Sequence, residues 1–194
     1  RKRTSSDSLM DWATKRESME GNVPLDGLLF PPTSGATFSQ CGNYRYKLWR
    51  IWDSSKPMIA FIGLNPSTAN ATSDDPTIRR VKGFAKQWGY GGVYMLNLFG
   101  IISSDPSILL TANDPIGDND RYLLEAAIDG LRVVFAWGSF KQIGERDKDV
   151  IAMFPNAICL KKSGAGKPWH PLYVKADIQP IYFNSELPWK ITYH

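Results

Sequence analysis

Asn65, Asn97 and His170 are the side chains in this sequence whose types and positions could carry chemistry. Each stands at or shortly after the end of an apolar run that is typical of a buried strand. A carboxamide can orient a water molecule but cannot take its proton at neutral pH, whereas an imidazole can donate or accept a hydrogen bond there. If the strands are parallel, the three side chains reach the same edge of the sheet.

Each of these residues also has a purely structural interpretation. The stretch from 63 to 68 contains the residue types of an ordinary turn between a strand and a helix. In such a turn Asn65 would bond to its own backbone, and Ser67 or Thr68 would cap the helix. A lone histidine such as His170 is more often a satisfied structural residue than a catalyst. A chemical role therefore requires that the three side chains meet at one edge.

The elements that would bring them together can be read from hydrophobic periodicity. Four apolar runs predict buried strands, and they span residues 58–62, 93–98, 131–137 and 157–160. A helix starting at Asp75 and Pro76 follows the first run, and a helix over about 119–128 precedes the third. This alternation predicts an α/β fold, a three-layer α/β/α sandwich with a central, mostly four-stranded parallel sheet.

The rest of the chain predicts one domain preceded by an arm. Residues 1–36 are polar and then rich in Pro and Gly, which predicts a peripheral arm that includes a short helix near residues 9–19. From residue 37 to residue 194 we expect a single domain, because 194 residues suffice for one sizeable core. Near its start, Tyr44, Tyr46 and Leu48 alternate with Arg45, Lys47 and Trp49, which predicts a half-buried strand.

Composition narrows the class of protein. With 43% hydrophobic and 22% charged residues, no apolar run of membrane-spanning length and no apolar signal core, the chain is expected to be a cytoplasmic monomer. Cys41 and Cys159 are isolated, and only two histidines are present, so we expect neither a metal nor a cofactor. The net charge of +4 is compatible with a polyanionic partner but does not establish one.

A basic stretch follows the last apolar run. It resembles a phosphate-binding loop only in part, because Lys161 and Pro168 occupy positions where that motif needs a Gly and a Ser or Thr. Glycine backbones nevertheless approach phosphates closely, and lysines supply positive charge. We therefore expect a flexible loop along a nucleic-acid backbone, formed by Lys161, Lys162, Ser163, Gly164, Gly166 and Lys167.

In their order along the chain, these segments resemble the motifs of the uracil-DNA glycosylase superfamily. The turn from Gly63 to Pro66 is similar to the first motif, in which a polar residue positions the attacking water. Asn97 resembles the strand-end residue that reads the Watson–Crick edge of a flipped pyrimidine. The segments 133–139 and 170–172 resemble the strand before the last motif and the His-Pro motif itself. The resemblance covers about residues 58–174.

The segments 44–46 and 63–69 and the His-Pro-Leu-Tyr ending also resemble a family of uncharacterised bacterial and phage proteins. That second resemblance names relatives without naming a substrate.

The superfamily resemblance implies a hydrolase, a DNA N-glycosylase that flips a nucleotide out of the stack and excises its base, leaving an abasic site. His170 would donate a hydrogen bond to the departing base, and Asn65 would hold the water. Asp74 or Asp75 would accept the water's proton, and Asp74 is the one assigned, because N-capping is the competing role of Asp75. The residues expected to bind the base are Gly63, Leu64, Asn97, Phe99 and Tyr44.

DNA is the partner that the resemblance implies. Ser67 would contact its backbone together with the basic loop, and Leu172 or Tyr173 would fill the gap left by the flipped nucleotide. Core packing is the competing role for these two residues.

Three departures from the superfamily bear on the substrate. Asn65 replaces the Asp of the uracil-specific enzymes, the loop 67–75 has no aromatic residue, and Leu172 and Tyr173 replace a Ser-Pro pair. A small, polar loop leaves room for a large base with hydroxylated groups, so we predict an enlarged modified pyrimidine, such as the hydroxymethylated or glycosylated cytosines of some phages. The role would then be antiviral phage defence; the competing role is base-excision repair of uracil or mismatched thymine.

Two further functions stay open. The first is a catalytically inactive nucleic-acid or nucleotide-binding module of the same fold, and the second is a hydrolase of free nucleosides or nucleotides. Release of a base from DNA would separate the predicted glycosylase from both.

Overall fold

The computed structural model describes residues 33–140 and 144–185, so the helix expected near 9–19 lies outside the described residues. The described residues belong to one compact unit. Its strands are β1 (Ser34–Phe38), β2 (Arg45–Ile51), β3 (Met58–Gly63), β4 (Gly92–Asn97), β5 (Arg132–Phe135), β6 (Ile158–Cys159) and β7 (Ile181–Tyr182). Its helices are α2 (Pro76–Gln87), α3 (Asn119–Ile128) and α4 (Arg146–Met153), with 3₁₀ turns η1 (Pro106–Leu110) and η2 (Pro171–Tyr173).

One mixed sheet runs through the unit in the order β1-β2-β4-β3-β5-β6-β7. The four strands predicted from apolar runs form its parallel centre, β4-β3-β5-β6. β1 and β2 extend the sheet antiparallel on one side, and β7 does so on the other. The α/β class is therefore confirmed, but the sheet has seven strands, so the expectation of a mostly four-stranded sheet was too small.

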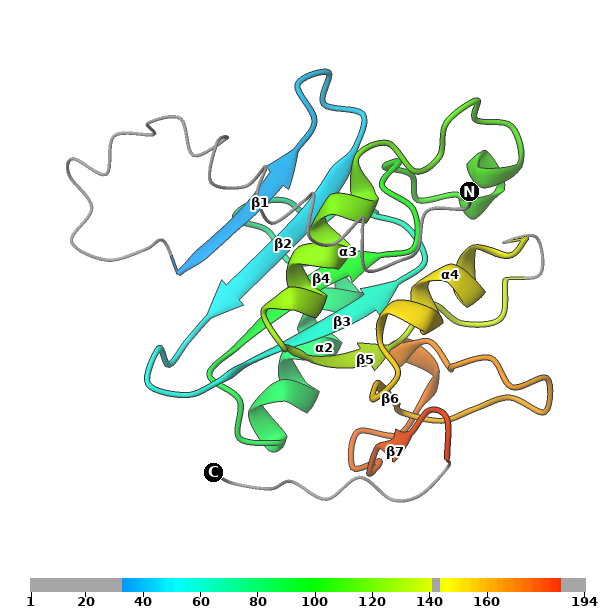
Figure 1. Ribbon diagram of the computed structural model, residues 1–194. Helices are drawn as coiled ribbons and strands as arrows, with labels where there is room; N and C mark the ends of the chain where they lie inside the picture. The colour runs from blue at the N-terminus through cyan, green and yellow to red at the C-terminus, as the bar shows by residue number, and fades with distance from the viewer. Residues whose placement is uncertain (1–32, 141–143, 186–194) are drawn as a thin grey trace. The chain divides into compact units, whose positions relative to one another are not determined.

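Helices cover both faces of the sheet. In Figure 1, α3 and α4 lie in front of the sheet and α2 lies behind it. Ile78, Val81 and Phe84 of α2 belong to the apolar cluster on one face. Leu123 of α3 and Val150 of α4 belong to the cluster on the other face. Because each face is buried against helices, the central strands are mostly apolar, and their polar exceptions, Asn97 and Arg132, stand at strand ends.

Helix α2 begins where the sequence indicates. The Asp75 carboxylate accepts a hydrogen bond from the Ile78 backbone N–H at 2.8 Å, and Pro76 occupies the first turn, where a missing N–H has no cost. The expected N-cap role of Asp75 is confirmed. Since this helix starts directly after the loop that follows β3, its N-terminus lies at the carboxyl edge of the parallel strands.

The expected boundary after residue 36 falls inside β1. Gly35 pairs with Trp49 of β2, and a Cβ on this glycine would lie 2.2 Å from the Trp49 ring. This glycine therefore belongs to the sheet, where it makes room for the Trp49 indole, and it is not part of an arm.

Helix α4 was not among the elements predicted from the sequence.

Candidate active site

A cavity of about 420 Å³ lies at the carboxyl ends of the parallel strands, and we call it the carboxyl-edge cavity. Asn65, Asn97 and His170 all line it, so the structure brings together the three side chains that the sequence singled out. The predicted residues Gly63, Leu64 and Ser67 line it as well. The other lining residues are Arg45, Asp75, Thr77, Ile78, Met95, Ser103, Ser104, Pro106, Trp137, Gly138, Ser139, Phe140 and Tyr173.

Asn97 is the most informative of these residues. It ends β4 and is 1% exposed, yet neither its Nδ2 nor its Oδ1 has a hydrogen-bond partner among the described residues. Gly63 leaves the space for it, because a Cβ there would lie 2.9 Å from Asn97 Oδ1. Leaving a buried polar group unsatisfied costs about 1–3 kcal/mol, so an amide kept in this state is a strong candidate for binding a ligand.

The backbone around Asn97 is held by residues that the sequence did not point to. Asn119, at the start of α3, donates from Nδ2 to the Asn97 carbonyl at 2.7 Å and to the Leu98 carbonyl at 3.2 Å. Arg146 Nε donates to the same Leu98 carbonyl at 2.8 Å. These bonds fix the chain where it leaves the sheet and thereby fix the position of the Asn97 side chain.

Asn65 has a fixed orientation. Its Nδ2 donates to the Ser103 carbonyl at 2.9 Å and to the Pro66 carbonyl at 3.1 Å. The bond to Pro66 is the local turn contact of the structural interpretation, so that interpretation is correct in part. Because Nδ2 is used, Oδ1 is the atom left to accept a hydrogen bond, and it has no partner among the described residues.

His170 precedes the short turn η2. Its Nδ1 lies 3.4 Å from the Leu172 backbone N–H and accepts from it, which leaves the ring proton on Nε2. Burial lowers the pKa of His170 below its ordinary value, although nearby Asp75 opposes the shift. At neutral pH the ring is therefore an uncharged hydrogen-bond donor.

The two neighbouring carboxylates have different environments. Asp74 does not line the cavity; its carboxylate pairs with Arg50 Nε at 2.8 Å and with Lys82 Nζ at 2.6 Å. Burial raises the pKa of Asp74, but the hydrogen bonds from Lys82 and Arg50 outweigh it and lower this pKa below its ordinary value. Such a carboxylate is a poor proton acceptor. Asp75 lines the cavity, so the role assigned to Asp74 fits Asp75 better.

The aromatic residues at the cavity are not the expected ones. Tyr44 donates from its hydroxyl to the Asp114 carbonyl at 2.8 Å and does not line the cavity. Phe99 is 6% exposed and packs in the core. Neither side chain is placed to contact a ligand, so both assignments to base binding are corrected. The aromatic residues that line the cavity are Trp137, Phe140 and Tyr173.

The basic loop is a closed hairpin. Lys162 and Pro168 form an antiparallel bridge. Around the turn, in which Gly166 has φ +73°, the Ser163 backbone N–H donates to the Lys167 carbonyl at 2.8 Å, and the Lys167 backbone N–H donates to Ser163 Oγ at 3.2 Å. Lys167 Nζ is ion-paired with buried Asp147. Lys161 Nζ lies 4.3 Å from the centre of the Trp169 ring, and Lys162 Nζ donates to the Phe183 carbonyl at 3.2 Å.

None of the predicted DNA-contacting residues of this loop lines the cavity; they are Lys161, Lys162, Ser163, Gly164, Gly166 and Lys167. Two apolar side chains next to His170 do face solvent. Leu172 is 44% exposed and Tyr173 is 73% exposed, and Tyr173 lines the cavity. Core packing is therefore not the role of these two side chains.

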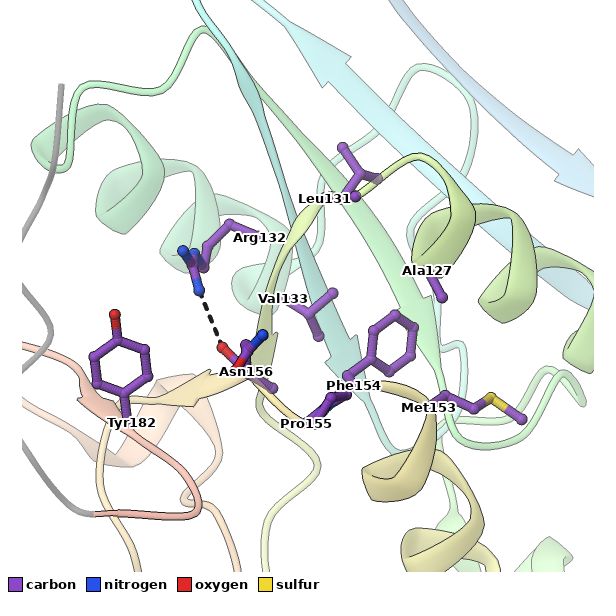
Figure 2. A pocket seen from close by; sticks show the side chains of 11 residues that line it. Ala127, Leu131, Arg132, Val133, Met153, Phe154, Pro155, Asn156 and Tyr182 are labelled. Carbon is purple, nitrogen blue, oxygen red and sulfur yellow. Dashed lines mark hydrogen bonds between the residues drawn. The ribbon is translucent and has the colours of Figure 1, made fainter. Parts of the chain in front are cut away.

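A second cavity, of about 440 Å³, lies at the amino ends of β5 and β6 (Figure 2), and we call it the amino-edge cavity. Arg132 Nη1 donates across it to the Asn156 carbonyl at 3.0 Å, and Tyr182 lies on its other side. None of the residues assigned to the site from the sequence lines this cavity.

Within residues 33–140 and 144–185, no helix combines the length and hydrophobicity of a membrane span, and no cluster of three His, Cys, Asp or Glu side chains is arranged for a metal. Comparisons with curated proteins and with solved structures gave no match. A family model described as "Protein of unknown function (DUF1643)" matches residues 45–172, well over half of the chain. Tyr173 is the one lining residue of the carboxyl-edge cavity outside this range. The chain therefore belongs to the DUF1643 family.

Proposed function

We propose that the protein is a DNA base N-glycosylase and that the carboxyl-edge cavity receives the flipped base. The observation that supports this most is the unpaired amide of Asn97, buried beside Asn65 and His170 in one cavity. A carboxamide offers one donor and one acceptor side by side, which is the pattern needed to pair with the edge of a pyrimidine. Reaching the glycosidic bond requires extrusion of the nucleotide.

The base would leave with the electron pair of the broken bond between its nitrogen and C1′ of the sugar. His170, uncharged and carrying its proton on Nε2, would donate a hydrogen bond to the base as negative charge builds up. A preorganised donor of this kind supplies a few kcal/mol of transition-state stabilisation. The imidazole need not change its charge during the step.

Water would complete the reaction at C1′. Asn65 Oδ1 would accept a hydrogen bond from the water and hold it, since Nδ2 is already bound to Ser103. The oxygen of the water would bond to C1′, and its proton would pass to a carboxylate. Asp75 is the carboxylate that lines the cavity, and one of its oxygens already caps α2. Its second oxygen is the one to receive the proton.

The substrate we propose is a modified pyrimidine larger than uracil. A volume of about 420 Å³ and polar walls that include Ser67, Thr77, Ser103 and Ser104 suit a base with a hydroxylated substituent. Hypermodified phage DNA would then be the target, and antiviral defence the role. Repair of uracil or mismatched thymine is the competing proposal.

The test is a mass-spectrometric screen for free bases released from DNA that contains uracil, mismatched thymine, 5-hydroxymethylcytosine or glucosylated 5-hydroxymethylcytosine. We expect release of a modified cytosine and formation of abasic sites. Asn65→Ala and His170→Ala should abolish release with little effect on folding or DNA binding. Release at wild-type rates by both variants would refute the assignment, and efficient release of uracil alone would refute the large-substrate proposal.

DNA binding without release of any base would favour the inactive binding module. Release from free nucleosides, but not from DNA, would favour a nucleoside hydrolase.

A further inference from the structure

Two arginines on β2 are buried in different ways. Arg45 is 2% exposed and Arg50 is 6% exposed, although the alternation of the strand places Arg45 on the same face as the half-buried Lys47 and Trp49. The pairing of β1 with β2 shifts between Thr37 and Phe38, next to Arg45, and both Arg45 and Tyr46 are buried as a result. A buried guanidinium needs hydrogen-bond partners, so the two sets of partners can be compared.

Arg50 is fully occupied by the protein. Its Nε pairs with Asp74, and its Nη1 and Nη2 donate to backbone carbonyls of the loop before α2, which lie at 3.0 Å (Ala71), 2.7 Å (Asn70) and 3.2 Å (Ser73). This guanidinium fastens the loop from residue 70 to 74 to the sheet. Its role is structural.

Arg45 is only partly occupied. Its Nη1 donates to the Ala69 carbonyl, whereas its Nε is buried without a hydrogen-bond partner among the described residues. The bond from Nη1 is the one side-chain hydrogen bond found between Arg45 and the described residues, so Nη2 is free to bind a ligand beside Nε. Nε and Nη2 lie on the same edge of a guanidinium and form a fork that matches two adjacent oxygen atoms. Arg45 lines the carboxyl-edge cavity, so the side chain with this unused fork borders the space for a ligand.

Arg45 also remains charged, with Asp75 as a nearby carboxylate. Burial lowers the pKa of Arg45 to about 10, with a further lowering by Arg50 and an opposite influence of Asp75, so the side chain remains a cation at neutral pH. Trp137 Nε1 is a second buried donor at the cavity without a partner among the described residues. Among the lining residues Arg45, Asn97 and Trp137, the cavity therefore has three buried unpaired donors and one buried unpaired acceptor, Asn97 Oδ1.

We propose that Arg45 is a specificity-determining residue whose Nε and Nη2 bind a ligand group with two adjacent oxygen acceptors. The inference deepens the proposed function and rests on it for the identity of the ligand as a base. On a pyrimidine, the two oxygens come from a carboxylate or from neighbouring hydroxyls of an attached sugar. An unmodified cytosine or uracil leaves the fork unfilled, and a site with unpaired buried donors rejects such an analogue strongly.

The test measures binding without catalysis. Cytosine, 5-carboxycytosine and glucosylated 5-hydroxymethylcytosine, each as the free base, are titrated into wild type, Arg45→Met, Arg45→Lys and the control Arg132→Met by calorimetry. Wild type should bind one of the two oxygen-bearing bases roughly 10- to 100-fold more tightly than cytosine, as expected for a bidentate contact. Preference for the carboxylated base identifies a carboxylate, and preference for the glucosylated base identifies sugar hydroxyls.

Arg45→Met should reduce this preference to about one, Arg45→Lys should keep less than a third of it because an ammonium lacks the fork, and Arg132→Met should keep all of it. Circular dichroism and thermal unfolding check that the variants fold. If Arg45→Met does not fold, the binding preference of Arg45→Lys tests the inference. Absence of a preference in wild type, or a full preference in either Arg45 variant, overturns the inference. An Arg45-dependent preference without base release from DNA refutes the proposed function alone.

Discussion

The carboxyl-edge and amino-edge cavities have nearly the same volume, about 420 and 440 Å³, but they differ in the state of their polar groups. At the carboxyl edge, Asn97, Arg45 and Trp137 each have a buried nitrogen without a partner among the described residues. At the amino edge, no lining side chain has a buried polar atom in that state, and Arg132 is bonded to the Asn156 carbonyl.

Cavity volume therefore does not locate the proposed site in this protein. A hollow between strand ends follows from imperfect packing of loops and can occur at either edge. Unsatisfied buried polar groups are more informative than volume, because each lowers the stability of the free protein, and those that border a cavity can receive the missing bond from a ligand. The polar groups of the carboxyl edge therefore support the proposal that a ligand binds there, and substitutions at both edges test it.

The largest effect is expected for Asn97→Leu. An apolar side chain of similar size removes the unsatisfied amide, so the free energy of unfolding should rise by about 1–3 kcal/mol. Base release should fall by about 100-fold or more, because the edge of the base loses both of its partners. Denaturant unfolding and single-turnover release assays measure the two effects. A variant that is less stable than wild type would show that the amide has a structural partner, and the comparison of the cavities would fail.

The next effect is expected for Asp75→Asn. Asparagine caps helices as well as aspartate does, so the stability should change by less than about 0.5 kcal/mol. It cannot accept a proton at neutral pH, so base release should fall by roughly 100-fold, the lower end of general base catalysis. Asp74→Asn is the matched control. It weakens ion pairs to Arg50 and Lys82 and should reduce stability more than it reduces the rate per folded molecule.

Much of this site could be predicted from the sequence because its main residues lie at or just after the ends of strands that apolar runs indicate. Apolar runs indicated the four parallel strands, and parallel strands bring Asn65, Asn97 and His170 to one edge. The choice between Asp74 and Asp75 could not be predicted. Adjacent carboxylates differ only in their distant partners, and Arg50, which holds Asp74, comes from a strand 24 residues away in the sequence.

Arg45 and Asn119 were missed for a similar reason. The period-two pattern of a strand predicts that Arg45 faces solvent, and only an irregularity in the pairing with β1 buries it. Asn119 looks like an ordinary first residue of a helix, and its bonds to the end of β4 depend on how α3 packs. Periodicity within one element cannot indicate contacts that arise between elements.

A smaller effect is expected from pH. The pKa of His170 is lowered on folding, so the unfolded chain takes up this proton first as the pH falls below about 6.5. The stability associated with the neutral ring is therefore complete above that pH and is lost as the pH falls through the folded pKa. Wild type should lose more stability than His170→Gln between pH 7.5 and 5. Equal losses in the two proteins would show that the ring titrates as it does in the unfolded chain.

The smallest effect on activity is expected for Arg132→Met at the amino edge. This substitution removes one cation, as Arg45→Met does, but the cation that it removes lies at the opposite ends of the strands and is bonded to a backbone carbonyl. Stability should fall by about 1–2 kcal/mol, because Arg132 loses its hydrogen bond to Asn156 and its interaction with Tyr90, and base release should stay within about twofold of wild type. Lower net charge alone would weaken DNA binding slightly and equally in both variants. Release assays at saturating DNA remove that shared contribution. A loss at the amino edge as large as the loss for Asn97→Leu would mean that satisfied and unsatisfied polar groups do not distinguish the two cavities.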